Sequence, residues 1–283
     1  MNNIFKTIQD AEVIAVFAGA GMGVDSGLEQ YRGADGLWTK CILINDKEIA
    51  YKDLLCHESF DTMPEQSWAF VACMTDQYKH AIPHKGFEIL LDLVKDKEYF
   101  IVTSNCDEQF QKAGFDTNKI WECHGSVFNM QCMDILERNV YKTPLLEIDT
   151  ERMVLISDVP KCPVCGLNCR PNMYLFYDWF WVSNYSVAQQ LKYNKWHKDI
   201  KASGKKIVAL EIGAGKTIDT VRKAARSFTE EDIPLIRVNP NDYEVERANQ
   251  LGLAMGAKEF FVGKRESPPS EGVASLNPSK RGN

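Results

Sequence analysis

Two glycine-rich stretches directly follow apolar segments that read as β-strands. In such turns, backbone N–H groups can close on a pyrophosphate at a helix start. Neither stretch fits a common nucleotide fingerprint, because Val24 and Leu210 stand where the dinucleotide and Walker A patterns require glycine. A tight strand-to-helix turn without a ligand is the alternative. The residues concerned are Gly19, Ala20, Gly21, Gly23 and Gly27 in the first stretch and Gly213, Ala214, Gly215 and Lys216 in the second.

Polar residues that could bind a ligand or take part in catalysis follow other apolar segments. Asn105 and Asp107 follow residues 99–105, where they could bind sugar hydroxyls or an amide-bearing ring. Asp107 could equally cap the following helix. His124, beside Gly125, is a candidate general base because imidazole titrates near neutral pH, although a single histidine can also be structural.

The nine cysteines are an odd number, and most are expected to be free, buried thiols. Four of them are spaced in a way that suggests more. Cys162 and Cys165 form a C-x-x-C pair, with Cys132 before it and Cys169 after it. Such spacing is typical of structural zinc sites, which nearly always have four ligands.

The elements that must position these residues alternate between strands and helices. Apolar runs predict strands at residues 12–18, 99–105, 205–215 and 234–240, and helical periodicity predicts helices at 83–96, 186–202, 217–228 and 243–251. This alternation is typical of an α/β fold with a doubly wound parallel sheet, which binds ligands beyond the carboxyl ends of its strands. Gly19, Asn105, Gly213 and Asn239 should therefore share one rim.

Two regions break this alternation and predict a smaller inserted lobe. We assign residues 1–33, 82–127 and 183–265 to the main domain. Residues 34–81, a helical insertion, and 128–182, which carry the clustered cysteines, form the lobe. Residues 266–283 are poor in large apolar side chains and are expected to be a disordered tail.

Composition limits the partners. Thirty-three basic residues against 39 acidic ones give a net charge of −6, so neither nucleic acid nor an acidic membrane surface is an expected partner. Residues 1–9 do not read as a signal peptide, and no apolar run is long enough for a membrane span. A cytoplasmic protein is expected, and its oligomeric state is left open.

Several motifs together resemble one family. "GAGMGVDSGLEQYRG", "TSNCD", "CHGS" and "RPNMYLF" occur in the order and spacing of the sirtuins, the NAD-consuming protein deacylases and ADP-ribosyltransferases. The resemblance spans about residues 10–262. It implies a Rossmann-like NAD-binding domain and a small lobe similar to the sirtuin zinc-binding domain, here with a degenerate zinc ribbon.

The resemblance also implies roles for the site residues. Asn105 would contact the nicotinamide ribose, Asp107 would hold the nicotinamide carboxamide, and His124 would be the general base. Tyr31 and Arg32 would belong to the loop that closes over the ribose. The remaining NAD-binding residues would be Gly19, Ala20, Gly21, Gly27, Trp38, Gly213, Ala214, Gly215, Lys216 and Asn239.

The chain departs from the family at several positions. Glu29 and Gln30 replace a proline and an aspartate in the first motif, and Gly23 replaces a serine. Bulky Tyr177 replaces a glycine in the segment that pairs with the substrate peptide, where it could narrow the acyl-lysine channel. Of the two cysteine pairs that hold family zinc, one is complete, with Cys162 and Cys165, whereas Ile135 stands where the partner of Cys132 would fall.

The resemblance predicts an NAD-dependent protein-lysine deacylase that acts on an acylated protein or peptide and releases nicotinamide and O-acyl-ADP-ribose. Protein ADP-ribosyl transfer or NAD hydrolysis at the same site is the alternative. A module that binds NAD without turnover is the third possibility.

Overall fold

The computed structural model describes residues 2–29, 40–44, 47–175, 178–230 and 233–263. Five residues singled out in the sequence, Gln30, Tyr31, Arg32, Trp38 and Tyr177, lie outside these ranges, as does the expected tail at 266–283. No helix in the described ranges is both long and apolar enough to cross a lipid bilayer.

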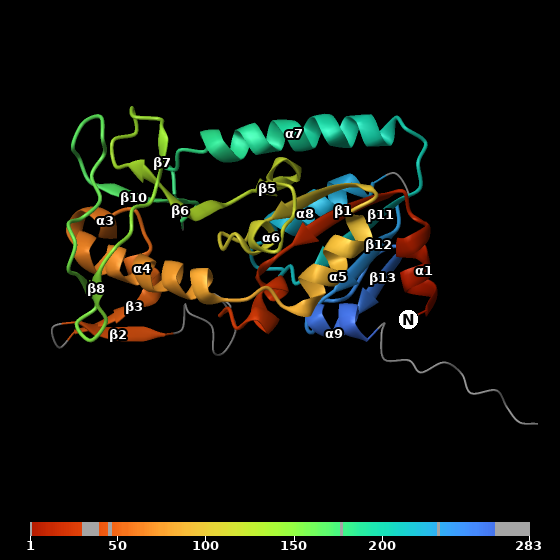
Figure 1. The fold of residues 1–283 in the computed structure, drawn as a ribbon, viewed down its shortest axis with the longest axis horizontal. Coiled ribbons are helices and arrows are strands. Elements are labelled where there is room, and N and C mark those ends of the chain that lie inside the picture. The colour runs from red at the N-terminus through yellow and green to blue at the C-terminus, as the bar shows by residue number, and fades with distance from the viewer. Residues whose placement is uncertain (1, 30–39, 45–46, 176–177, 231–232, 264–283) are drawn as a thin grey trace, which may run out of the picture.

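A six-stranded sheet, parallel throughout, forms the larger part of the molecule (Figure 1). In chain order its strands follow the arrangement 3-2-1-4-5-6 of doubly wound nucleotide-binding folds, with a switch point between β1 and β11. The predicted fold class is confirmed. Its strands are β1 (Val13–Ala18), β4 (Glu98–Thr103), β5 (Ile120–Glu122), β11 (Ile207–Ile212), β12 (Leu235–Val238) and β13 (Gln250–Leu253).

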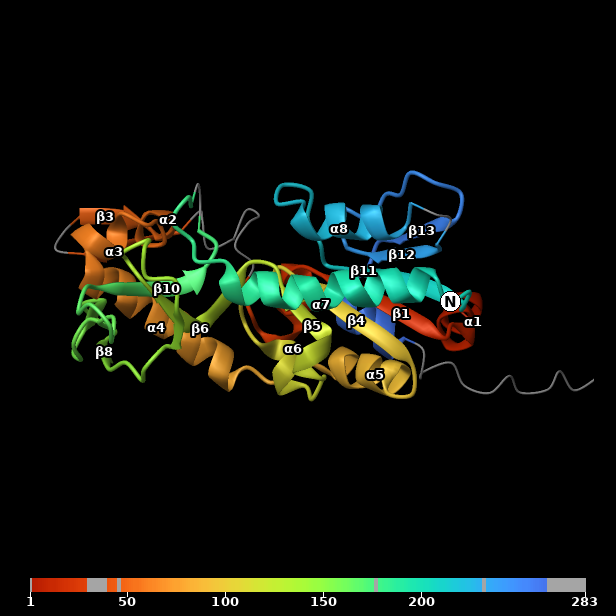
Figure 2. The same ribbon diagram turned by 90° about the horizontal axis from the view of Figure 1, so that it is seen from above.

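Helices cover both faces of this sheet, which explains why β1 is apolar throughout (Figure 2). Ile14 and Val16 pack on one face with side chains of α1 (Asn2–Asp10), α5 (Lys85–Val94) and α9 (Ala257–Val262). The alternate residues Ala15 and Phe17 pack on the other face with α7 (Asn184–Lys201) and α8 (Thr220–Phe228). Burial on both faces therefore fixes the position of the strand that leads into Gly19.

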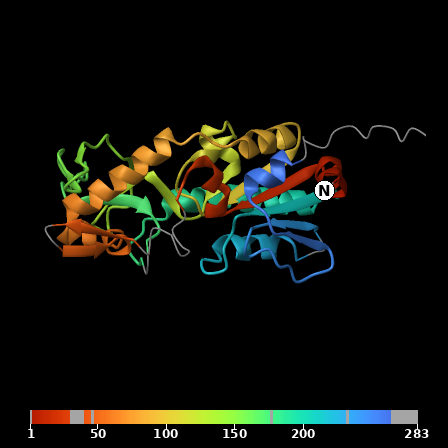
Figure 3. The same ribbon diagram turned by 90° about the horizontal axis from the view of Figure 1, so that it is seen from below.

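A smaller lobe lies at the other end of the molecule, and Figure 3 shows it beside the sheet from below. Its core gathers around Trp68 and Phe60, and Nε1 of Trp68 donates to the carbonyl of Cys169 at 2.8 Å. The lobe contains α2 (Tyr51–Leu54), α3 (Ser59–Thr62), α4 (Pro64–His80), the hairpin β2 (Cys41–Ile44) and β3 (Lys47–Ala50), the sheet β10-β6-β7 (Cys169–Met173, Gly125–Cys132, Val140–Lys142) and the pair β8 (Ile148–Asp149) and β9 (Val154–Leu155).

Small turns complete the chain near the sheet: the 3-10 turns Ala20–Met22, Val24–Ser26 and Thr117–Lys119, and α6 (Gln109–Lys112). The lobe's strand β6 begins at Gly125, close to the predicted boundary at residue 128. The domain bounds themselves stay a prediction.

One predicted helix, at residues 243–251, is wrong. The segment runs without helix and ends in β13, the edge strand that pairs with β12. Gly252 of β13 lies so close to the chain that a Cβ on it would be 2.1 Å from the carbonyl oxygen of Tyr243. Arg237 also donates to the carbonyl of Glu244, so tertiary contacts override the local helical pattern.

Candidate active site

The two glycine turns pack against each other at the switch point of the sheet. The N–H of Gly19 donates to Ile212 at 2.9 Å, and that of Gly21 donates to Gly213 at 3.0 Å. A Cβ on Gly19 would lie 2.6 Å from the Gly213 carbonyl oxygen, and Gly213 has φ +62°. Glycine is therefore required here by the close approach of two backbones, whether or not a ligand binds.

Two buried asparagines tie neighbouring strand ends to these turns. Nδ2 of Asn105, which follows β4, donates to the Gly19 carbonyl at 3.1 Å. Nδ2 of Asn239, which follows β12, donates to the Ala214 carbonyl at 3.0 Å. The structure thus brings together the four residues that the sequence places on one rim, at the ligand-binding edge of this fold class.

Asp107 lies beside this rim and has a structural contact of its own. Its Oδ1 accepts the N–H of Gln109, the first residue of α6, at 3.0 Å, but the N-cap of this short helix is Glu108, not Asp107. Its Oδ2 faces Gly23, 3.5 Å from where a Cβ would lie. Burial raises the pKa of Asp107 to about 6, so the carboxylate is mostly ionised at pH 7.

His124 lies in the turn between β5 and β6, where the chain passes from the large sheet into the small lobe. Gly125 makes this turn with φ +75°, and a Cβ on it would lie 2.2 Å from the Asn172 carbonyl oxygen. Nε2 of His124 lies 3.1 Å from Oγ1 of Thr220. Burial lowers the pKa of His124 to about 4, which leaves a neutral imidazole at pH 7.

His84 is a structural element of the site that the sequence analysis missed. Its Nδ1 accepts the N–H of Gly86 at 2.9 Å, so Nε2 carries the proton and donates to the carbonyl of Met22, also at 2.9 Å. This side chain joins the start of α5 to the first glycine turn. Its place just before an amphipathic helix was the available signal, whereas nothing local in the sequence points to the contact of Thr220 with His124, 96 residues away.

Two other predicted NAD-binding residues, Lys216 and Gly27, are exposed, whereas Ala214 is buried. Nζ of Lys216 lies 3.0 Å from a carboxylate oxygen of Glu244 and 3.5 Å from one of Asp242. Gly27 ends a 3-10 turn with φ +81°. Glu29, which stands where sirtuins have proline, pairs with Lys40 at 2.9 Å.

Three of the four singled-out cysteines converge in the small lobe. The Sγ atoms of Cys132, Cys162 and Cys165 lie within 4.8 Å of one another, and those of Cys132 and Cys165 are 3.4 Å apart. Burial opposes ionisation of Cys162, but hydrogen bonds from the N–H groups of Cys165 and Val164 and from the thiols of Cys165 and Cys132 together lower its pKa. Three convergent soft donors fit Zn²⁺. Cys169 pairs with Cys132 across the strands but is not in this group, and the described residues supply no fourth ligand within it.

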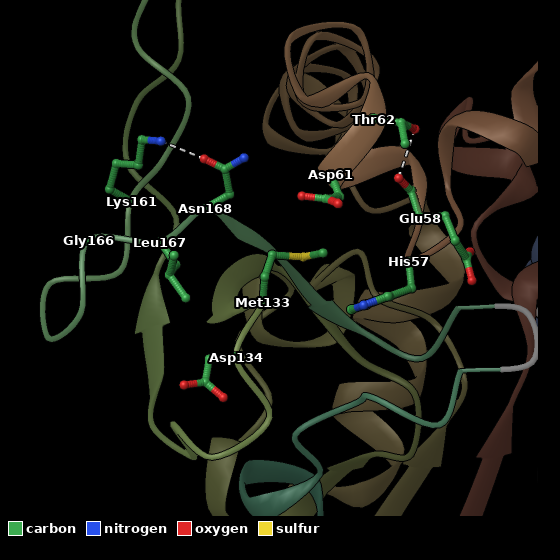
Figure 4. Close-up of a pocket in the computed structure, with 10 residues that line it drawn as sticks. All are labelled: His57, Glu58, Asp61, Thr62, Met133, Asp134, Lys161, Gly166, Leu167 and Asn168. Atoms are coloured by element: carbon green, nitrogen blue, oxygen red, sulfur yellow. Dashed lines mark hydrogen bonds between the residues drawn. The ribbon is translucent and has the colours of Figure 1, made fainter.

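A cavity of about 650 Å³ lies next to residues 162–167, the cysteine loop, with His57 and Asp61 on one side and Lys161 and Asn168 on the other (Figure 4). None of the predicted NAD-binding residues within the described ranges lines it. Lys161 is already engaged by Oδ1 of Asn168 at 2.6 Å. We therefore place the candidate active site at the sheet rim.

Comparisons with known proteins identify the family of this chain. A sequence model of the Sir2 family matches residues 19–192. The NAD-dependent protein deacylase of Aquifex aeolicus is 26% identical over 265 residues, covering 92% of this chain and 98% of its own. That of a Thermus thermophilus strain is 25% identical, covering 90% and 89%.

Solved structures show the same fold. A Sir2 homologue mutant in complex with ADP-ribose superimposes with a TM-score of 0.70 at 20% identity, covering 92% of this chain and 93% of that one. A Sir2 homologue in complex with NAD gives 0.68, with 92% and 91% covered. With more than half of its length matched by the family model, the chain belongs to the Sir2 family, the sirtuins.

Proposed function

We propose that this protein is an NAD-dependent protein-lysine deacylase. The observation that carries the proposal is the convergence of Asn105, Asp107 and both glycine turns on the switch-point rim, with neutral His124 in the turn after β5. The relatives named as NAD-dependent protein deacylases, which align over most of the chain, support it.

Each residue has a task that suits its chemistry. NAD would supply an electrophilic ribose carbon, which the acyl-lysine amide oxygen attacks as nicotinamide leaves. Asp107 would accept the N–H of the nicotinamide carboxamide, and Asn105 would bind the ribose. His124 would take a proton from a ribose hydroxyl, which is worth about 10²–10⁴-fold as general-base catalysis. Holding a weak nucleophile in reach while excluding water would supply much of the rest.

The remaining contacts follow from the rim. Gly19, Ala20 and Gly21 would line the pyrophosphate, with Gly213, Ala214, Gly215, Lys216 and Asn239 toward the adenosine half, and Gly27, Tyr31, Arg32 and Trp38 would complete the NAD site. An acylated protein or peptide is the proposed partner, and the cytoplasm is the proposed compartment.

The test is product analysis with NAD and an acyl-peptide library. O-acyl-ADP-ribose, detected by mass spectrometry, is expected from the wild type and from His80→Ala, an exposed histidine that serves as the matched control. His124→Ala should lower its formation at least 100-fold while NAD still binds in calorimetry. Labelled ADP-ribose retained on protein would instead favour transfer, free ADP-ribose without peptide would favour NAD hydrolysis, and binding without nicotinamide release would favour a non-catalytic module.

We propose a structural zinc ion on the incomplete set Cys132, Cys162 and Cys165, with a fourth ligand that is not among the described residues of this cluster. It would close the loop that contains Gly166 on the end of β6, and it has no part in the chemistry. Metal analysis of the purified protein should find about one zinc per chain, and Cys162→Ser should lose it. Protein that contains no zinc and in which Cys132, Cys162 and Cys165 all react with a thiol reagent would contradict this proposal.

A further inference from the structure

The imidazole of His124 is held by a residue from the opposite half of the sheet. Nε2 lies 3.1 Å from Oγ1 of Thr220, the first residue of α8. The backbone of His124 is fixed separately, because its carbonyl accepts the N–H of Tyr174 at 2.9 Å and the thiol of Cys106 at 3.5 Å. Two sets of contacts therefore position the main chain and the ring independently.

Among the described residues, Thr220 makes the one hydrogen bond to this ring. The aromatic ring of Tyr174 packs at 5.9 Å between centroids, tilted by 44°. Such packing restricts where the imidazole lies, but it cannot decide which ring nitrogen carries the proton. That choice is set by the hydrogen bond that one nitrogen makes.

The ring is neutral, so it offers one N–H donor and one acceptor nitrogen. If the hydroxyl of Thr220 donated to Nε2, the proton would sit on Nδ1, and neither nitrogen would be free to accept another. If Nε2–H donates to the hydroxyl, Nδ1 keeps a free lone pair. A general base requires the second arrangement.

We propose that Thr220 is a positioning residue for His124, whose hydroxyl accepts the Nε2–H and thereby leaves Nδ1 as the nitrogen that takes the ribose proton. This inference rests on the proposed function of His124. The Nε2–H···Oγ1 bond persists when Nδ1 is protonated, so proton uptake requires no rearrangement of the ring. Because Thr220 begins α8, the same contact couples the base to the loop after Gly213.

The test compares Thr220→Val, which keeps the shape but lacks the hydroxyl, with Thr220→Ser, which restores it. We expect kcat for deacylation to fall about tenfold in the valine variant, the effect of one lost hydrogen bond. KM for NAD should change less than twofold. The serine variant should recover kcat to within about threefold of the wild type, and the exposed Thr117→Val should behave as the wild type.

Nitrogen-15 NMR of the histidine rings provides a readout that needs no turnover, with His124 assigned by its loss in His124→Ala. The wild type should show Nε2 protonated and Nδ1 unprotonated, and Thr220→Val should show averaging of the two tautomers. A proton on Nδ1 in the wild type, or an unchanged kcat in Thr220→Val, would overturn the inference. Full activity of His124→Ala would overturn the base role itself, whereas loss of activity there with normal Thr220→Val turnover would overturn only the role of Thr220.

Discussion

The sheet rim and the cysteine loop are both glycine turns, but different forces shape them. At the rim, Gly213 takes φ +62° with the backbone of Gly21 and Met22 pressed against it. In the cysteine loop, Gly166 takes φ +76°, and nothing lies within 4 Å of where its Cβ would be. One glycine is needed for both conformation and space, and the other for conformation alone.

This difference separates what packing fixes from what ligands fix. Inter-strand pairing and backbone hydrogen bonds hold the rim in place before any substrate arrives. In the cysteine loop, local backbone hydrogen bonds close the turn, such as that from the N–H of Gly166 to the carbonyl of Cys162 at 2.9 Å, and the three thiols converge on a point where a metal could bind. Rigidity at the rim suits a site that must present several groups to one substrate.

The largest expected effect comes from alanine at Gly213, with alanine at Gly166 as the comparison. Gly213→Ala adds left-handed strain of about 1–2 kcal/mol and a backbone clash of about 1–3 kcal/mol, so it should cost about 4 kcal/mol of unfolding free energy. Gly166→Ala should cost about 1 kcal/mol, because it adds strain alone. Urea denaturation measures both. Equal losses at the two positions would show that close packing does not distinguish rim from loop.

The contrast also explains which parts of the fold the sequence could predict. β1, β4, β11 and β12 are found because burial on both faces makes each a mainly apolar run, and the charged residues inside β11 and β12, Glu211 and Arg237, are buried as an ion pair at 2.6 Å. β13 is missed because it is an edge strand with partly exposed residues. The sequence of its segment has a helical pattern, but the close approach of Gly252 to the carbonyl of Tyr243 is incompatible with a helix over residues 243–251. Such long-range contacts leave no local pattern.

The site divides in the same way. Asn105, Asp107 and His124 could be identified because strand ends are local features and because the motifs resemble those of a family. The contacts that these side chains make could not be predicted from the sequence. Asn105 binds Gly19 across 86 residues of chain, and His124 binds Thr220 across 96 residues. The cysteine set was recognisable by spacing, but the separation of Cys169 from the other three depends on strand register.

A buried ion pair offers a second way to probe the small lobe. Nη2 of Arg170 lies 2.7 Å from Oδ2 of Asp178, and neither side chain is exposed. Asp178 also accepts the N–H groups of Leu175 and Phe180, so it anchors the segment that carries the 90% exposed Trp179. Asp178→Asn should cost about 3 kcal/mol of unfolding free energy, because it leaves a buried, unpaired guanidinium.

Arg170→Met with Asp178→Asn completes a double-mutant cycle on this pair. The double variant should be destabilised by less than the sum of the single ones, because no buried charge is left without a partner. Additive losses would mean that the two side chains act separately, the arginine by filling space and the aspartate through its backbone contacts.

A smaller effect than those of Gly213→Ala and Asp178→Asn is a pH dependence confined to the rim. Asp107 should hold nicotinamide as a carboxylate, and burial raises its pKa to about 6, so protonation removes the acceptor as the pH falls through this value. For one linked proton, NAD affinity should be about tenfold weaker at pH 5 than at pH 7, or about 1.4 kcal/mol. His124, with a pKa of about 4, stays neutral across most of this range. Calorimetric titration with NAD measures the change.

Two variants assign this dependence to Asp107. Asp107→Asn should bind NAD more weakly at pH 7 and lose the dependence between pH 7 and pH 5. Glu122→Gln is the matched control: burial raises the pKa of Glu122 to about 7, but its carboxylate accepts from Gln111 and Gln189 and has no proposed contact with NAD. If Glu122→Gln abolished the dependence and Asp107→Asn kept it, the titrating group would be Glu122, which lies against α7. Asp107 would then keep the same charge between pH 5 and pH 7.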